Sequence, residues 1–420
     1  MLTLDLFPAL ELSVTARRLL LVTLVAILAG CAVTPPAPPI SPTPPTPPTP
    51  PAPTLPAQYQ PVTFDVLPGW RDDEVRAVWP AFLMGCKALL GKPARSAPWE
   101  APCRAAATLD ARDDVAVRNF FETHFSPYQV TAPDGRDTGL VTGYYEPLLL
   151  GSRTWSARYP APLYGPPDDL LTIDLSELYP EFKGKRLRGR VEGRRVVPYW
   201  DRAGIDAGRA ELSSRALVYV EDPVEAFFLE IQGSGRIQLE DGSVVRLGYA
   251  DQNGHPYRAI GRVLAERGYL EIERTSMQNI RAWGRRNPDK LPEILEANPS
   301  YVFFREVPPF PPGSLEAMID GPIGSLGVPL LRERTVAVDP RAVPLGAPLF
   351  LATTYPSTSR PLQRMVIAQD TGGAIRGAVR VDYFWGFGPE AGQQAGRMRQ
   401  EGHVWMLWPK GAPLPDASGG

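Results

Sequence analysis

The sequence predicts a mainly β fold with some helices (β + α), and two stretches of the chain carry this prediction. Residues 159–276 contain short alternating apolar and polar runs separated by turn residues, a pattern typical of a small β-domain. Residues 365–410 contain a second group of strands joined by glycine-rich turns, which we expect at 365–369, 379–384 and 403–408. Helical spacing is confined to separate segments, which are 73–90, 114–124, 257–267, 276–286 and 291–297. Two local expectations follow from these patterns. Residues 226–232 alternate as a strand, and residues 386–392 form a tight loop.

The composition is that of a globular protein of two or three domains. The chain has 420 residues, of which 44% are hydrophobic and 21% charged, with a net charge of −2. Near-neutral charge and the lack of a basic run interleaved with aromatic residues give no support for nucleic-acid binding. The three histidines, His124, His255 and His403, lie far apart without ligand spacing. We therefore expect no metal and no cofactor.

The first 30 residues have the features of an export signal. Arg17 and Arg18 precede an apolar run at 19–28, and Leu28-Ala29-Gly30-Cys31 resembles a bacterial lipobox. This pattern predicts cleavage before Cys31 and acylation of that residue, and several acyl chains on one residue make a stable membrane anchor. Because Ala32 follows, with no aspartate to retain the protein at the inner membrane, we expect an outer-membrane lipoprotein facing the periplasm of a Gram-negative bacterium. An ordinary secretory signal is the alternative.

Two further features of the sequence, a proline-rich segment and a pair of cysteines, can be interpreted in view of this location. Residues 35–56 are mostly proline with threonine, alanine and serine, which favours an extended chain of about 3.1 Å per residue. Residues 31–57 are therefore interpreted as an acylated cysteine and a tether. Cys86 and Cys103 are the two cysteines that remain, and an oxidising periplasm favours a disulfide between them. Two buried thiols that never meet are the alternative.

Asp382 is the residue in 365–410 that local structure does not explain. It lies in the middle of the strand expected at 379–384, where propensity disfavours aspartate, and burying it unpaired would be costly. Asp339 and Asp370 stand instead at turns, before a proline and before a Gly-Gly pair respectively. At those positions a structural role is the expected one.

These aspartate segments occur in one order with several other motifs, and together they resemble the membrane-bound lytic murein transglycosylase A family. The other motifs are GYYEP at 143–147, EIQGSG at 230–235, YADQNGHPYRAIG at 249–261 and NPSYVFF at 298–304. The resemblance covers nearly all of the chain after the proline-rich segment. It implies a double-psi β-barrel domain with a second small β-domain inserted into it. The barrel would comprise residues 58–147 and 305–420, with the three-aspartate part at about 325–410, and the insertion would comprise 148–304.

The resemblance also implies an activity and a site. The family cleaves the β-1,4 bond between N-acetylmuramic acid and N-acetylglucosamine in peptidoglycan and forms a 1,6-anhydromuramoyl product. One carboxyl group with a raised pKa is enough for this reaction, and the catalytic position maps to Asp382, with Asp339 and Asp370 as supporting aspartates. A polymeric sugar needs a groove between two domains. The candidates that would line this groove are Tyr144, Tyr145, Gln232, Ser234, Gly235, Tyr249 and Asn253.

Two other functions stay open at this stage. A non-catalytic lipoprotein that grips peptidoglycan would keep the anchor, the tether and the groove, but it would not need Asp382. An inverting polysaccharide hydrolase on the same barrel would need a second carboxylate opposite Asp382, and Glu146 and Glu230 are the candidates. The sequence does not decide between exo and endo action, the preferred glycan length, the dependence on peptide stems, or the protein partners.

Overall fold

A closed barrel forms the larger part of the computed structural model, which describes residues 57–92, 96–182, 185 and 187–415. The strands of this sheet are β1 (Gln58–Pro61), β2 (Phe125–Thr131), β3 (Thr138–Glu146), β13 (Thr335–Val338), β14 (Pro348–Thr354), β15 (Pro361–Asp370), β16 (Val381–Phe387) and β17 (Arg399–Pro409). Their order is β1-β2-β17-β14-β15-β13-β16-β3, and β3 pairs back onto β17, which closes the ring. The pairings β13–β15 and β16–β3 are parallel, so the chain has to cross over between them.

Helices cover one side of the barrel, and this explains why its strands are apolar on both faces. All four residues of β13 and the first six of β14 are buried. The covering helices are α2 (Trp79–Leu90), α4 (Glu100–Ala106) and α5 (Asp114–His124). Phe82 of α2 packs its ring against Phe120 at 5.6 Å and Phe121 at 5.2 Å, both on α5. The cap of α5 is Asp113, whose side chain accepts from the Val115 N–H.

The segment between β3 and β13 builds further sheets and a group of helices. A six-stranded sheet has the order β12-β11-β10-β4-β9-β5, and a three-stranded sheet has the order β6-β7-β8. Their bounds are β4 (Leu148–Ser152), β5 (Ala161–Tyr164), β6 (Leu171–Ile173), β7 (Leu187–Glu192), β8 (Arg195–Pro198), β9 (Ala216–Val220), β10 (Ser234–Leu239), β11 (Val244–Gln252) and β12 (Val302–Glu306). The helices are α6 (Arg202–Asp206), α7 (Pro223–Gln232), α8 (Ile260–Glu266), α9 (Met277–Arg286), α10 (Leu291–Glu296) and, after β12, α11 (Leu315–Ile319). No helix in the described ranges is long and apolar enough to cross a membrane.

Helix caps overturn the strand expected at residues 226–232, which lie in α7. The Asp222 side chain accepts from the N–H groups of Val224 and Glu225, and Pro223 occupies the first turn. Gly233 ends the helix with a φ of 74°, in the left-handed region that favours glycine. The alternation in this stretch was therefore misleading, because the two ends are both helix signals.

Proline and glycine positions explain two further differences. The helix expected at 73–90 is divided into a 3-10 turn, Val75–Val78, and α2, which begins at Trp79 with Pro80 in its first turn. Proline is favoured there because the first N–H groups of a helix have no partner within it. The loop expected at 386–392 is instead the end of β16 and the start of α12 (Gly388–Arg397).

A disulfide joins two of the covering helices. The sulfur atoms of Cys86 on α2 and Cys103 on α4 are bonded at 2.06 Å, with a sequence separation of 17 residues. Both residues are buried in the core that α2 and α4 share with the barrel. The bridge therefore ties the helical cover together on one side.

Replacing both cysteines, as Cys86→Ser/Cys103→Ser, should lower the free energy of unfolding by about 3 kcal/mol, because a loop of this length restricts the unfolded chain. Urea unfolding of the purified protein would show this as a lower midpoint. The parent protein measured under reducing conditions is the control and should approach the variant. An unchanged midpoint would mean that the bridge adds nothing to stability.

Candidate active site

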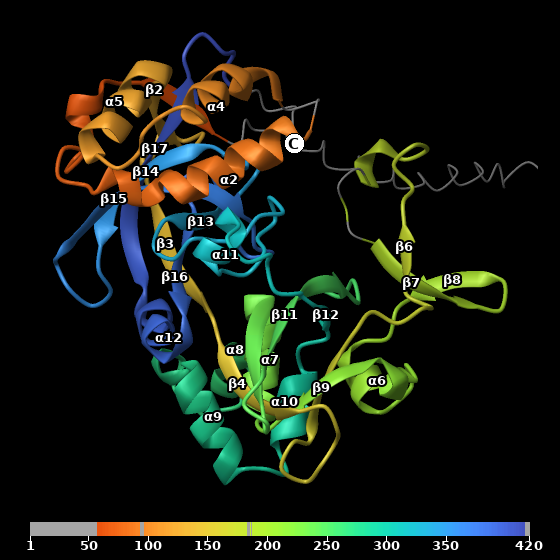
Figure 1. The fold of residues 1–420 in the computed structure, drawn as a ribbon. Helices are drawn as coiled ribbons and strands as arrows, with labels where there is room; N and C mark the ends of the chain where they lie inside the picture. Colours follow the sequence, from red (N-terminus) through yellow and green to blue (C-terminus); the bar gives the residue numbers. More distant parts are fainter. Residues whose placement is uncertain (1–56, 93–95, 183–184, 186, 416–420) are drawn as a thin grey trace, which may run out of the picture. The chain divides into compact units, whose positions relative to one another are not determined.

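Two hydroxyl groups of β3 hold two aspartates from neighbouring strands. Thr142 Oγ1 donates to Asp382 Oδ1 at 2.6 Å, and the Tyr144 hydroxyl donates to Asp370 Oδ2 at 3.0 Å. β16 runs parallel to β3 with Asp382 opposite Thr142, and Asp370 is the last residue of β15 (Figure 1). Because side chains alternate along a strand, Thr142 and Tyr144 share one face. Three strands of the barrel thus bring both carboxyl groups to one place.

The surroundings of Asp382 favour the protonated acid. Burial raises the pKa of Asp382 to about 6, and the charge of Asp370 acts in the same direction. The Thr142 hydrogen bond and the positive charge of Arg380 oppose this rise in the pKa. The ring of Phe384, two residues along the same strand, lies 5.1 Å from that of Tyr144 and supplies apolar surface. A carboxyl group in these surroundings can both donate and recover a proton near neutral pH.

Tyr383 and Trp385 are close to Asp382 in the sequence, but their side chains serve the other face of β16. The Tyr383 hydroxyl donates to the Glu333 carbonyl at 2.8 Å, and Trp385 Nε1 donates to the Met398 sulfur at 3.2 Å. Both side chains are buried in the barrel core. The desolvation of Asp382 therefore comes from its own face of the strand, where Phe384 lies.

Asp370 lies in a cluster with Asp382, Thr142 and Tyr144, which we call the Asp382 cluster, and it also stands at a turn. Its carboxylate accepts from Ser325 N–H at 2.9 Å and from Ser325 Oγ at 2.8 Å, in addition to the Tyr144 hydroxyl. Burial raises the pKa of Asp370 above its ordinary value, although these donors favour the ionised form. The expectation of a purely structural residue is too narrow, because the charge of Asp370 reaches Asp382.

Asp339 occupies a different kind of site. It is 1% exposed, and Arg341 donates to its two oxygens at 3.0 and 2.6 Å, while the Gly377 N–H donates at 2.9 Å. Burial alone would raise the pKa of Asp339, but the Arg341 guanidinium and the Gly377 N–H together hold it below the ordinary value. Asp339 thus joins the turn after β13 to the segment that precedes β16.

The two other candidate acids, Glu146 and Glu230, are each neutralised by a buried arginine. Arg236 Nε donates to Glu146 Oε2 at 2.9 Å. Arg202 binds Glu230 through two parallel hydrogen bonds of 3.0 and 2.7 Å, and the Val302 N–H adds a third at 2.9 Å. The Glu146 pair joins β3 to β10, and the Glu230 pair lies within the inserted segment. Burial raises the pKa of Glu146 and Arg236 opposes this rise, but in both glutamates the carboxylate is occupied by an arginine.

Several of the predicted sugar-binding residues meet where β3 contacts the inserted segment. Gln232 Oε1 accepts from the Tyr145 N–H at 3.1 Å, and the Tyr145 ring packs so close to Gly392 of α12 that a Cβ there would lie 2.9 Å from it. Tyr249 of β11 is 37% exposed and lies beside Gly233. Ser234 and Gly235 begin β10, next to Gln232.

Gly235 and Asn253 each have a structural role that explains why this residue type occurs at the position. A Cβ on Gly235 would lie 2.1 Å from Leu229 Cδ1, so glycine is needed there for packing. Asn253 is 1% exposed, its Nδ2 donates to the carbonyls of Trp200 and Pro299, and its Oδ1 accepts from the Tyr301 N–H. The expectation that Asn253 contacts sugar is therefore corrected, because its amide is fully used inside the protein.

Three residues around the two aspartates were not predicted from the sequence: Thr142, Ser325 and Arg380. Thr142 could have been found, because it stands two residues before Tyr144 and must share its face in a strand. Ser325 carries no local signal, whereas Arg380 stands two residues before Asp382 and so falls on the same face of the strand expected at 379–384. The first reaches Asp370 from a distant turn, and the second reaches Thr142 across the β3–β16 pair.

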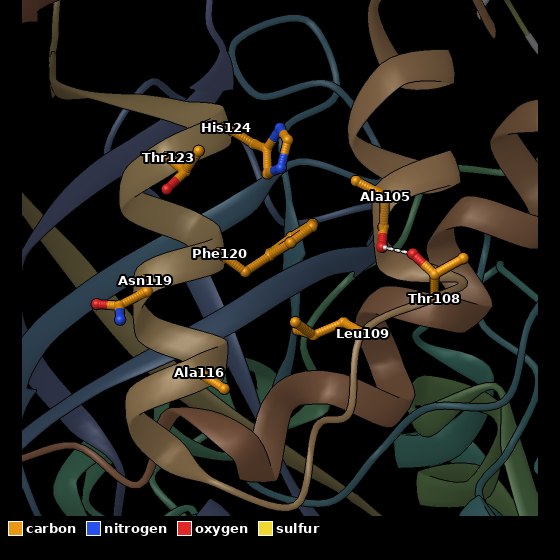
Figure 2. A pocket seen from close by; sticks show the side chains of 8 residues that line it. All are labelled: Ala105, Thr108, Leu109, Ala116, Asn119, Phe120, Thr123 and His124. Carbon is orange, nitrogen blue, oxygen red and sulfur yellow. Dashed lines mark hydrogen bonds between the residues drawn. The ribbon is translucent and has the colours of Figure 1, made fainter.

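A surface hollow lies elsewhere, between α4 and α5 (Figure 2). Its lining includes Phe120, Leu109 and His124, and the Thr108 hydroxyl at its edge donates to the Ala105 carbonyl at 3.1 Å. None of its lining residues belongs to the Asp382 cluster. Within the described ranges, no group of three or more histidine, cysteine, aspartate or glutamate side chains is arranged to hold a metal ion.

Comparison with known proteins agrees with this architecture. Residues 140–305 match the family model of the MltA specific insert domain, and residues 334–408 match that of the 3D domain. Membrane-bound lytic murein transglycosylase A of Escherichia coli (strain K12) is 33% identical over 298 residues, which cover 69% of this chain and 71% of the relative. The crystal structure of MltA from Neisseria gonorrhoeae is 41% identical with a TM-score of 0.74, covering 85% of this chain and 94% of that one. A structure of E. coli MltA with bound chitohexaose is 27% identical with a TM-score of 0.58, covering 85% and 92%.

The barrel with its inserted segment, together with these relatives, defines an enzyme that cleaves a glycan strand. The fold is a double-psi β-barrel with a second domain inserted into it. The chain belongs to the membrane-bound lytic murein transglycosylase A family, and it is a peptidoglycan lytic transglycosylase.

The site predicts a shift in the pH dependence of activity for Asp370→Asn. If neutral Asp382 is the acid that cleavage needs, the activity falls as the pH rises through the pKa of Asp382, which is about 6. Removing the charge of Asp370 lowers that pKa, and the falling limb should move to lower pH. Because the neutral fraction of Asp382 falls as its pKa falls, turnover at neutral pH should decrease as well.

Rates of anhydro-muropeptide release from sacculi across the pH range would measure this shift. Asp339→Asn is the matched control, and it should lower the melting temperature without moving the limb. If Asp370→Asn lowers the melting temperature and leaves the limb in place, Asp370 is structural only.

Proposed function

We propose that Asp382 is the single catalytic acid and base of this lytic transglycosylase. Neutral Asp382 gives its proton to the glycosidic oxygen between N-acetylmuramic acid and N-acetylglucosamine, and the bond from that oxygen to C1 of the muramic residue breaks. The C6 hydroxyl of the same muramic residue attacks C1, and its proton passes to the Asp382 carboxylate. The products are a 1,6-anhydromuramoyl end and a free 4-hydroxyl on N-acetylglucosamine. No water is consumed, and Asp382 returns to its starting state.

This proposal rests on one observation: Asp382 is half-buried, its pKa is raised, and its carboxyl group accepts a hydrogen bond from the Thr142 hydroxyl. One such group is sufficient, because the same carboxyl acts first as an acid and then as a base. Glu146 and Glu230, the two glutamates expected as the second carboxylate of a hydrolase, are both held by arginines, so neither supports that alternative.

The glycan would bind beside Asp382, in a groove between the barrel and the inserted domain. The bound chitohexaose in the E. coli relative supports a site for several consecutive sugars. Tyr144, Tyr145, Gln232, Ser234 and Tyr249 are the proposed contacts, and the backbone at Gly235 adds to them. The boundaries proposed for the two domains are 58–147 with 305–420 for the barrel, and 148–304 for the insertion.

We further propose that Cys31 carries a lipid anchor in the outer membrane and that residues 31–57 are the tether to the catalytic body. Both lie almost wholly outside the described residues, so the support is the lipobox sequence and the membrane-bound relatives. The periplasmic side of that membrane faces the peptidoglycan, which is the substrate. An anchor there would keep the enzyme within reach of it.

Asp382→Asn should lower the turnover by roughly a thousandfold or more, because the amide can neither give nor take the proton. The measurement is release of 1,6-anhydro-muropeptides from purified sacculi, followed by mass spectrometry. Asp241→Asn makes the same chemical change at an exposed turn and should leave turnover unchanged. A variant at position 382 that keeps about a tenth of parental turnover would refute the assignment. Products with free reducing ends would instead indicate hydrolysis.

Cys31→Ser should release the protein from the membrane fraction, because the side chain that receives the lipid is gone. Fractionation of cells that produce the parent and the variant would measure this, with turnover on isolated sacculi as the control for folding. A variant that stays as membrane-bound as the parent would show that the anchor lies elsewhere in the chain.

A further inference from the structure

The Thr142 hydroxyl is shared by two charged side chains, Asp382 of β16 and Arg380, which directly precedes that strand. Thr142 Oγ1 donates to Asp382 Oδ1 at 2.6 Å, and Arg380 Nη2 donates to Thr142 Oγ1 at 2.8 Å. The arginine is itself held by backbone, since Nη1 donates to the carbonyls of Leu140 at 3.2 Å and Val381 at 2.5 Å. A fixed chain of hydrogen bonds therefore runs from Arg380 through Thr142 to Asp382.

The chemistry of these groups fixes the direction of the chain. A guanidinium can only donate, whereas a hydroxyl carries one hydrogen and two lone pairs. Arg380 occupies one lone pair of Thr142 Oγ1 and polarises its O–H bond, so the hydroxyl hydrogen is directed to Asp382 Oδ1. Oδ1 then acts as an acceptor whether Asp382 is neutral or ionised.

We propose that Arg380 and Thr142 are positioning residues that keep Oδ1 of Asp382 occupied and reserve its Oδ2 for the proton that the reaction transfers. The proposal rests on the proposed role of Asp382 as the catalytic acid. Neither positioning residue needs to touch the glycan. Thr142 acts on Asp382 directly, and Arg380 acts through Thr142.

Reserving one oxygen matters because the same carboxyl group acts twice in each turnover. The proton leaves Oδ2 for the glycosidic oxygen, and the proton from the C6 hydroxyl returns to Oδ2. The hydrogen bond from Thr142 can persist through both steps, so the carboxyl plane does not have to turn. Without it, the carboxyl group could rotate, and either oxygen could carry the proton. A reacting group displaced by about 1 Å can lose a hundredfold in rate.

Other charged and titratable groups face this chain from neighbouring strands. Asp370 of β15 and Tyr144 of β3 lie in the same cluster, and the charge of Asp370 acts on Asp382 in the direction opposite to that of Arg380. A change in pH dependence alone would therefore not identify the positioning role. The test needs turnover at a pH where Asp382 is already neutral, together with the pH dependence.

Thr142→Val removes the hydroxyl and nearly preserves the shape of the side chain. Its kcat should fall by about a hundredfold with little change in KM, because the glycan contacts are kept. The falling limb of activity should move to higher pH, because a hydrogen bond that lowers the pKa of Asp382 is lost. Thr142→Ser keeps the hydroxyl and should restore both kcat and the limb. A role limited to stability would not give this rescue.

Arg380→Gln combined with Thr142→Val gives a double-mutant cycle as the second test. The cycle is measured at a pH well below the pKa of Asp382. There almost all of Asp382 is neutral, so the charge of residue 380 no longer affects the neutral fraction of Asp382. In the parent, Arg380→Gln should lower kcat by about tenfold, and in Thr142→Val it should lower kcat by less than about twofold, because the arginine acts through the missing hydroxyl. Melting temperatures of all variants control for folding. If Thr142→Val folds poorly, the kcat of Arg380→Gln alone still tests the role of the arginine.

The outcomes separate this proposal from the proposed function. If Thr142→Val keeps the parental kcat and pH limb, or if Arg380→Gln lowers kcat by the same factor in both backgrounds, the positioning role is wrong. If those results come with an inactive Asp382→Asn, the acid assignment still stands. If Asp382→Asn is active, both proposals fail together.

Discussion

The parallel pairing of β3 with β16 is the constraint on which the rest of the site depends. It places Thr142 opposite Asp382 and, two residues along, Tyr144 on the same face as Thr142. A shift of one residue between the strands would turn every side chain of one strand to the other face. If β16 were the strand that shifted, Thr142 would lose Asp382 and Tyr383 would take its place. The register of one strand pair thus decides where the acid lies.

The partner of each carboxylate distinguishes the structural carboxylates of this protein from the two in the candidate active site. Asp73, Glu146, Glu230 and Asp339 are each paired with an arginine, at 2.9, 2.9, 2.7 and 2.6 Å. An arginine fixes a carboxylate in place and favours its ionised form, although burial still raises the pKa of Asp73 and that of Glu146. Asp382 and Asp370 are bound instead by hydroxyl groups and, for Asp370, by backbone N–H groups. Arg380 approaches Asp382 but contacts Thr142, so its charge lowers the pKa of Asp382 without an ion pair to that carboxylate.

The resulting pKa of Asp382 is a balance between opposed effects. Burial and the neighbouring Asp370 raise it, whereas the Thr142 hydroxyl and the Arg380 charge lower it, and the outcome is about 6. An acid with a much lower pKa would rarely be protonated near neutral pH, and one with a much higher pKa would give up its proton reluctantly. A lytic transglycosylase needs the same group in both states within one turnover. The hydroxyl partner suits this requirement, because it can bind the carboxyl group in either state.

Much of the local structure was determined by the sequence itself. The α5 helix, the β9 strand and the position of Asp382 within a strand follow from periodicity, and the order of motifs pointed to the family. Other features were decided by tertiary structure. Glu146 and Glu230 are paired with distant arginines, and the strand order brings Asp370 close to Asp382. The helix at 226–232 has instead a local cause that competes with its alternation, because both of its ends are capped. Alternation and caps are local properties of the chain, but strand register and ion pairs join residues far apart in it. No single segment of the sequence specifies the pairing of Thr142 with Asp382, which are 240 residues apart.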